Sequence, residues 1–391
     1  MSNKSEAEFP EALITEEMVA EVRKYIGIKL RTENCTSNRE ATGTAIQKFA
    51  DGIGDTNPLW TDPEYAVKTR YGMVVAPPSW VFSVFAAVQY GFRGLGGFHS
   101  SSDVRFYLPV LKDDVITPEM TCIDVEGPKK SKFADKTLIE CDENLYKNQR
   151  GDVVTALDFK VTHFERLRAR KKGEHSKVEL PHPWSEEELK TIEEEVLNEK
   201  RNGADTPSWD DIEIGQELNQ LVKGPITMSD EIAFLIGGGA PIPRIRAHKA
   251  ALDFYKRHQA WAFRDPASGG LEPIYAVHYN RAAARAQGLP YPYDVGFQRH
   301  CWQIHLLTNF AGDEGWVKRS SIELRGFVYF SDVVWLKGII TDKFIDEENE
   351  CCVKIETTTT NQRGKEVMPG YGIVALPSKE RGYSPLDKRI R

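Results

Sequence analysis

The sequence is poor in cysteine, and its cysteines do not form a metal-binding pattern. Six are scattered over 391 residues, without a Cys-x-x-Cys spacing and without a histidine at zinc-finger distance. We therefore expect reduced structural thiols and no metal site. The six are Cys35, Cys122, Cys141, Cys301, Cys351 and Cys352.

The sequence also lacks a long hydrophobic run. Its longest apolar stretch, Trp80 to Val88, is broken by Ser83 and is far shorter than the roughly 20 residues that span a bilayer. Residues Met1 to Ile14 are polar and acidic, without the apolar centre of a signal peptide. We expect a cytoplasmic protein with no membrane segment.

There is no excess of positive charge. The 51 basic residues are outnumbered by 58 acidic ones, and the net charge of -7 argues against a nucleic-acid partner, because phosphate binding requires a basic face. A hydrophobic content of 40% and a charged content of 28% are typical of a soluble globular protein. The length fits two domains of about 150 to 200 residues each.

Two parts of the chain read as weak copies of each other. Capping-box spacing at Thr44–Gln47 and at Thr227–Asp230 predicts the start of a helix in each copy. Further on, each copy has an apolar run that predicts a longer helix. These runs are Ser79–Tyr90 and Gln298–Phe310.

Strand candidates follow both apolar helices. The tetrapeptide Asn-Gln-Arg-Gly occurs at 148–151 and again at 361–364, each time as a predicted turn between strands. Residues 157–162 alternate between apolar and polar types, which predicts a strand with one buried face. A helix followed by antiparallel strands, twice over, predicts an α+β fold in which each sheet wraps around its helix.

The two copies are separated by a charged segment. We predict a first domain over residues 1–165, a connector over 166–207, a second domain over 208–380 and a basic tail over 381–391. The connector begins with a basic stretch, which we interpret as a solvated linker; contact with ligand phosphates is the alternative. The segment Pro241–Gly270 reads as an insertion that could cover a pocket or contact a partner.

The segment Gly54–Asp62 carries the most specific motif. Its pattern Asp55-x-Asn57-Pro58-Leu59, with Asp62 and Ala66 following, resembles the signature of the MaoC-like (R)-specific enoyl-CoA hydratases. The resemblance implies a tandem hot-dog fold, with a FAS1-like dehydratase domain in the first half. It also implies a CoA thioester substrate and no cofactor.

In that family an aspartate and a histidine five positions later hold the water that is added to an enoyl-CoA. The match places Asp55 on the catalytic carboxylate and Asn57 on the loop asparagine, but Trp60 stands in place of the histidine. An indole has an N–H donor and no basic nitrogen, so Trp60 cannot be the base. We expect it instead to line an acyl-binding pocket.

The second copy supplies the missing histidine. His278, Asn280 and Ala284 repeat the spacing of Trp60, Asp62 and Ala66. We therefore predict His278 as the base, Asn280 as a substrate-binding residue and Gly296 as the N–H donor to the thioester oxygen. Pro273 stands five residues before His278, where the aspartate is expected. Glu272 and Asp294 are the alternative carboxylates.

Several interpretations stay open at this point. Asp55 and Asn57 could simply organise a turn, and His278 could be a structural histidine. His300 and His305 diverge by about 140° on a helix, which makes joint metal binding unfavourable. The leading hypothesis is a hydratase or dehydratase with its working site in the second half. The alternative is a non-catalytic acyl-CoA-binding protein, as a homodimer or in a hetero-oligomer with another hot-dog chain.

Overall fold

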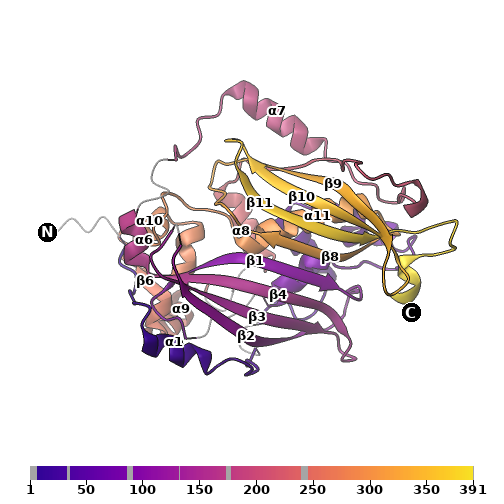
Figure 1. The fold of residues 1–391 in the computed structure, drawn as a ribbon. Coiled ribbons are helices and arrows are strands. Elements are labelled where there is room, and N and C mark those ends of the chain that lie inside the picture. The colour runs from indigo at the N-terminus through magenta and orange to yellow at the C-terminus, as the bar shows by residue number, and fades with distance from the viewer. Residues whose placement is uncertain are drawn as a thin grey trace.

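The computed structural model describes residues 7–32, 36–85, 91–131, 133–172, 178–238 and 245–390 (Figure 1). Among these residues, nine strands form one continuous sheet in the order β2-β3-β4-β1-β8-β11-β10-β9-β5. The strands are β1 (Gly96–Phe106), β2 (Thr117–Lys129), β3 (Thr137–Lys147), β4 (Val153–Phe164), β5 (Leu221–Lys223), β8 (Trp316–Glu323), β9 (Val334–Ile345), β10 (Cys351–Asn361) and β11 (Glu366–Ala375).

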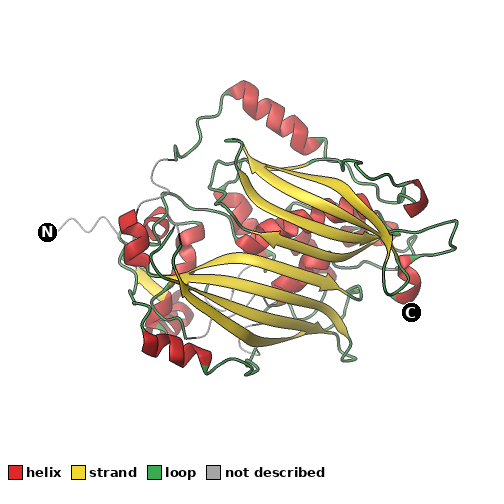
Figure 2. Ribbon diagram, viewed as in Figure 1, coloured by secondary structure: helices red, strands yellow, loops and turns green. Residues whose placement is uncertain are grey.

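The two copies meet at the centre of this sheet. Strand β1 of the first half pairs antiparallel with β8 of the second, with Ser102 opposite Ile322 and Val104 opposite Ser320. Figure 1 shows the two sets of strands as adjoining curved sheets, and Figure 2 shows helices packed along the sheet. The predicted α+β fold with two antiparallel units in one chain is confirmed.

The repeated Asn-Gln-Arg-Gly segments form matching turns, as predicted. Gly151 and Gly364 have φ angles of 86° and 67°, which favour glycine. Gln149 donates to Asp114 at 2.7 Å, and Gln362 donates to Asp332 at the same distance. Gln149 and Gln362 thus occupy the same position in the two halves, and they are 213 residues apart (362 minus 149). With this offset, residues of β3 correspond to residues of β10, and residues of β4 correspond to residues of β11.

The long helix of the second half is α11 (Gly296–Ala311), which lies buried against the sheet. This confirms the predicted helix over Gln298–Phe310. The first half differs: a 3-10 turn over Pro78–Trp80 leads into the short helix α5 (Val81–Val84), and Phe85 is extended. The carbonyls of Ser83 and Val84 accept hydrogen bonds from Ser37. The prediction of a helix continuing through Phe85 is therefore wrong, and residues 86–90 lie outside the described part.

Helices α2 (Gly43–Ile53) and α8 (Met228–Ile236) pack against each other across the two halves. A Cβ at Gly52 would lie 2.7 Å from the carbonyl oxygen of Ala233, so only glycine permits this approach. The predicted capping box at Thr227 is confirmed. In the first half the cap is Thr42 rather than Thr44.

Shorter elements complete the fold. They are α1 (Glu16–Arg23), α3 (Pro58–Thr61), α4 (Pro63–Ala66), α6 (Arg166–Lys172), α7 (Glu186–Leu197), α9 (His248–Arg257), α10 (Arg281–Ala286) and the hairpin of β6 (Ala262–Arg264) and β7 (Leu271–Pro273). None of the described helices has both the length and the apolar character needed to span a bilayer.

The basic stretch expected to be a solvated linker is partly buried, and so is the basic tail. Arg166, at the start of α6, is only 3% exposed, and its guanidinium donates to the carbonyls of Pro10 and Gly94. Near the other end of the chain, Leu386 is fully buried and Arg389 forms an ion pair with Glu350 at 2.8 Å. The proposed domain limits themselves stay a prediction.

Candidate active site

A cavity of about 670 Å³ lies between the two halves. The second half contributes His278, Asp294 and Gly296 to its wall, and the first half contributes Phe98 and His99. This volume is typical of sites that bind small molecules. The cavity therefore brings together three of the residues predicted from the sequence.

His278 ends the 3-10 turn that begins at Ile274. Its ring lies 4.7 Å, centre to centre, from the rings of both Tyr275 and Tyr293. Nδ1 lies 2.9 Å from the carbonyl oxygen of Tyr293. Because a carbonyl can only accept, Nδ1 carries the proton and Nε2 keeps its lone pair.

The protonation state of His278 suits a base. Burial lowers the pKa of its imidazole to about 4, against the smaller opposing effect of hydrogen bonds to the main chain of Tyr293 and Asp294. The ring is therefore neutral at pH 7. A neutral imidazole with a fixed tautomer can take a proton from a bound water.

Neither candidate carboxylate is paired with this histidine. Asp294 reaches the cavity, but both of its oxygens accept hydrogen bonds from Arg299, one of them from Nε at 2.7 Å. Burial raises the pKa of Asp294 while Arg299 opposes the rise. Glu272 lies on β7, opposite Phe263, and is absent from the cavity wall. A catalytic role for Asp294 or Glu272 stays a prediction.

Asn280 is used by the local fold. Its side-chain oxygen caps α10 by accepting from the N–H groups of Ala282 and Ala283, at 2.9 Å and 3.2 Å. Its amide nitrogen donates to Asp265. Asn280 does not line the large cavity. A direct substrate contact by this residue stays a prediction.

The first-half motif forms a separate buried cluster. Asp55 accepts hydrogen bonds from the main-chain N–H of Asn57 at 3.0 Å and from the indole N–H of Trp60 at 2.9 Å. Asn57 caps α3 by accepting from Leu59. His305, on α11, lies 3.4 Å from Asp55. These contacts fit the alternative in which Asp55 and Asn57 organise a turn.

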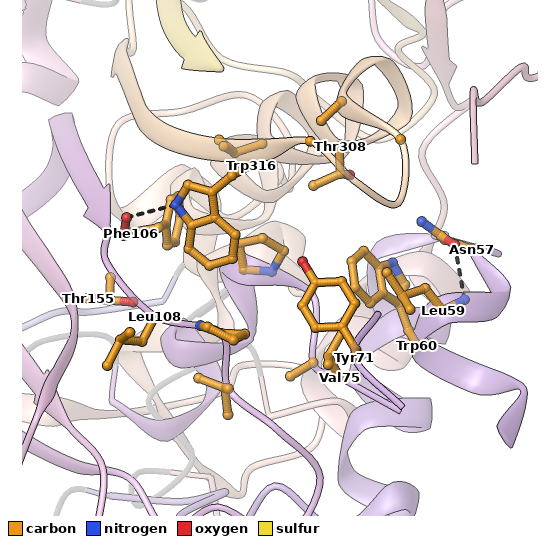
Figure 3. Close-up of a pocket in the computed structure, with 18 residues that line it drawn as sticks. Asn57, Leu59, Trp60, Tyr71, Val75, Phe106, Leu108, Thr155, Thr308 and Trp316 are labelled. Carbon is orange, nitrogen blue, oxygen red and sulfur yellow. Dashed lines mark hydrogen bonds between the residues drawn. The ribbon is translucent and has the colours of Figure 1, made fainter. Parts of the chain in front are cut away.

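Trp60 faces a different cavity from His278. It lies with Tyr71 and Trp316 around a small space of about 40 Å³ (Figure 3). Such a volume is of the order needed for one or two waters and is far too small for an acyl chain. Trp60 does not line the large cavity, whose first-half wall includes residues of β1 and β4.

His99 is a cavity residue that no motif in the sequence indicates. It lies on β1 and lines the large cavity beside the start of α11. A Cβ at Gly296 would be 2.5 Å from Nδ1 of His99, so glycine is required at this contact. Nδ1 is buried and has no hydrogen-bond partner among the described residues.

A buried hydrogen-bond chain ends at His99. The chain runs from Gln303 to Ser320 (2.9 Å), from Ser320 to His300 (3.0 Å), from His300 to Ser102 (2.7 Å) and from Ser102 to His99 (3.1 Å). The amide nitrogen of Gln303 is a donor, and it also contacts the carbonyl oxygens of Ser321 and Tyr371.

The donor and acceptor roles of the two imidazole rings in this chain depend on their tautomers. In one assignment, Ser320 accepts from Gln303 and donates to Nε2 of His300, whose Nδ1–H donates to Ser102. The hydroxyl of Ser102 donates in turn to Nε2 of His99. In this assignment each serine hydrogen has an acceptor, and Nδ1 of His99 carries its proton. Burial lowers the pKa of His99 well below its usual value, which keeps the ring neutral.

Comparison with known proteins agrees with this architecture. The model of the FAS1-like dehydratase domain region matches residues 30–157. A UPF0336 protein of Streptomyces avermitilis is 49% identical over 120 residues, which are 29% of this chain and 77% of that protein. Another, from Thermobifida fusca, is 28% identical over 149 residues, covering 36% of this chain and 91% of that protein.

A protein of Thermomonospora curvata named "Probable enoyl-CoA hydratase alpha subunit" is 25% identical over 158 residues, covering 35% of this chain and 49% of that protein. Among solved structures, a MaoC-like dehydratase superimposes with a TM-score of 0.61 at 14% identity, covering 91% of this chain and 100% of that one. A MaoC domain dehydratase from Chloroflexus aurantiacus gives 0.54 at 12% identity, covering 90% and 96%. These structures share the fold.

Proposed function

Since this chain belongs to the MaoC-like family of two-domain hot-dog dehydratases, we propose that it is a hydro-lyase acting on a CoA thioester. It hydrates an enoyl-CoA or, in reverse, dehydrates a 3-hydroxyacyl-CoA. The observation that carries the proposal is the neutral His278, with Nε2 free to accept a proton, in a cavity of about 670 Å³.

The reaction needs a base and a site for developing negative charge. In hydration, Nε2 of His278 takes a proton from water as the water oxygen bonds to the β-carbon. The electrons of the double bond move toward the thioester oxygen, and the α-carbon then takes the proton from Nε2 of His278, which restores the neutral imidazole. The N–H of Gly296, at the start of α11, is the donor we assign to that oxygen, because helix N-termini favour negative charge.

The cavity wall also suits the CoA moiety. Arg325 and Lys365 both lie on it, in the second half of the chain. Two cationic side chains at one cavity complement the phosphate groups of CoA. Apolar residues from the first half, among them Phe98 and Phe159, provide a surface for the acyl group.

The test is hydration of crotonyl-CoA by the purified chain. We expect His278→Ala to lower kcat by roughly two to four orders of magnitude, the usual contribution of a general base. His258→Ala is the control, since this residue lies exposed at the end of α9. Full activity of the folded His278→Ala variant would remove His278 from the mechanism, and no crotonyl-CoA hydration by the natural chain would contradict the proposed function.

A non-catalytic subunit remains the second candidate. It is favoured by the engagement of Asp55 with Trp60 and by the absence, among the described residues, of a hydrogen bond between His278 and a carboxylate. Native mass measurement of the complex isolated from its own cells decides between them. A stoichiometric second hot-dog chain, together with inactivity of this chain alone, would support the subunit function.

A further inference from the structure

An interior strand of the first half has polar residues at buried positions, where apolar side chains are expected. On β3, Glu140, Asp142 and Asn144 all point to the buried face of the sheet and are 1%, 1% and 0% exposed. Strand β3 lies between β2 and β4, so these side chains are not at a sheet edge. Burying carboxyl and amide groups in such a place is costly unless each is paired.

The second half provides an internal comparison. With the offset of 213 residues, Glu140 corresponds to Val353 and Asp142 to Ile355, both fully buried on β10. Cys122, which pairs with Asp142, corresponds to Ile340, which pairs with Ile355. By the same offset, His163 corresponds to Leu376. The fold therefore accepts apolar side chains at all four positions, and the polar set of the first half is not required by the architecture.

The side chains of Cys122, Glu140, Asp142 and His163 lie close together. One ligand atom each from Cys122, Glu140 and Asp142 can be chosen so that all three lie within 4.8 Å of one another. Nε2 of His163, on β4, lies 2.8 Å from Glu140 Oε2. A thiol and two carboxylates thus face one point, and a histidine orients one of the carboxylates from the side.

Several buried polar atoms on β3 and β4 have no hydrogen-bond partner among the described residues. They are Oδ1 of Asp142, both amide atoms of Asn144 and Nδ1 of His163. Asp142 also forms no ion pair with any described residue. Burial, followed by the charge of Glu140, raises the pKa of Asp142 to about 9. Unpaired buried atoms at this density call for an ion or for bound water.

We propose that Cys122, Glu140 and Asp142 bind a divalent metal ion, and the donor set points to Zn²⁺. A thiolate together with carboxylates suits Zn²⁺ better than Mg²⁺ or Ca²⁺, which take oxygen ligands only. Ligand atoms around tetrahedral Zn²⁺ lie roughly 3.5 Å apart, given bonds of about 2.0 to 2.3 Å, so a small contraction of the cluster forms the site. His163 holds Glu140 in place, as outer hydrogen-bond partners of metal ligands do.

Binding exchanges protons for the metal ion. Cys122 and any protonated carboxyl group of the cluster release their protons to solvent, and the resulting anions coordinate the cation. The metal ion thus removes the cost of placing two acids side by side in the core. Binding must weaken as the pH falls.

The experiment is zinc binding by the whole chain, with matched variants. Cys122→Ser and Asp142→Asn remove one donor each. Cys141→Ser and Glu143→Gln are the controls, because these residues are neighbours on β3 with side chains on the other face. Each protein is stripped with chelator and dialysed against Zn²⁺, and bound metal is counted by mass spectrometry. Co²⁺ is used in parallel, since a thiolate ligand produces a near-ultraviolet charge-transfer band.

We expect one Zn²⁺ per chain for the natural protein and both controls, and binding weaker by about tenfold or more in the two donor variants. The Co²⁺ thiolate band disappears in Cys122→Ser alone among the serine variants. Thermal unfolding gives a second readout: Zn²⁺ raises Tm in the controls and not in Asp142→Asn, which folds without metal because its neutral amide needs no counterion. Less than one tenth of an equivalent of bound zinc in the natural protein, or equal zinc binding by Asp142→Asn and Glu143→Gln, overturns the proposal.

Discussion

The indole N–H of Trp60 donates to Asp55 at 2.9 Å, so the residue that replaces the family's histidine bonds to the family's carboxylate. In this arrangement one Asp55 oxygen serves Trp60 and the other accepts from the main chain of Asn57. The pair is buried, at 5% and 3% exposure. Its geometry holds the loop rather than a water.

This contact predicts a loss of stability without a loss of activity. Trp60→Phe removes the donor and leaves a buried Asp55 oxygen unpaired, which costs about 1 to 3 kcal/mol of unfolding free energy in urea titration. Crotonyl-CoA hydration by the folded variant should stay within about threefold, because His278 faces another cavity.

Trp335→Phe is the matched control for this substitution. It also removes an indole hydrogen bond, but one made to Glu195 at the exposed surface. Its cost should be within about 0.5 kcal/mol. If both variants lose the same unfolding free energy, the hydrogen bond from Trp60 to Asp55 does not stabilise the fold.

The low pKa of His278 predicts an unusual pH profile. Since burial lowers this pKa to about 4, Nε2 stays unprotonated down to that pH. We expect kcat/KM for crotonyl-CoA to be level between pH 7 and about pH 5 and to fall about tenfold per pH unit below about pH 4. A histidine of ordinary pKa would give the fall near pH 6.5.

The same shift has a consequence for stability, with a defined sign. Between pH 6.5 and about pH 4 the unfolded chain binds a proton at His278 that the folded chain does not. The contribution of His278 to stability is therefore lost as the pH falls through this window. The difference in unfolding free energy between the natural protein and His278→Gln should narrow or reverse there. A constant difference would contradict the assigned pKa.

Local patterns made much of the fold predictable from the sequence. The apolar run at 298–310 predicted α11 to within two residues at each end, and the two Asn-Gln-Arg-Gly turns were identified by their repetition. The end of α5 could not be predicted, since it depends on Ser37, which lies more than 40 residues earlier and takes the helix carbonyls.

Residues of the candidate site could be predicted only where a single segment of the sequence contains a recognisable pattern. His278 was found by its spacing, and Gly296 by its place before an apolar helix. His99 was not, because its role depends on contacts with Gly296 and, through Ser102, with His300. The cluster around Cys122 was not predictable either, because its residues come together only when β2, β3 and β4 pair in the sheet. No spacing in the sequence indicates this cluster.

The hydrogen-bond chain that ends at His99 gives the last prediction. Ser102→Ala removes the hydrogen-bond partner of Nε2 of His99, so the ring loses the contact that holds its orientation. Since Nδ1 lies against Gly296 at the start of α11, a ring free to turn disturbs the donor that we assign to the thioester oxygen. We expect kcat for crotonyl-CoA to fall about tenfold, with KM changed less than threefold, because charge stabilisation acts chiefly in the transition state.

Ser100→Ala separates this effect from simple loss of a hydroxyl on β1. The Ser100 hydroxyl donates to the main chain of Lys160 and is not part of the chain of contacts to His300. Its removal should leave kcat within about twofold. Ser102→Thr, which keeps the hydroxyl, should recover more activity than Ser102→Ala. If the alanine and threonine variants are equally impaired, packing at this position explains the loss, and the orientation of His99 has no part in the reaction.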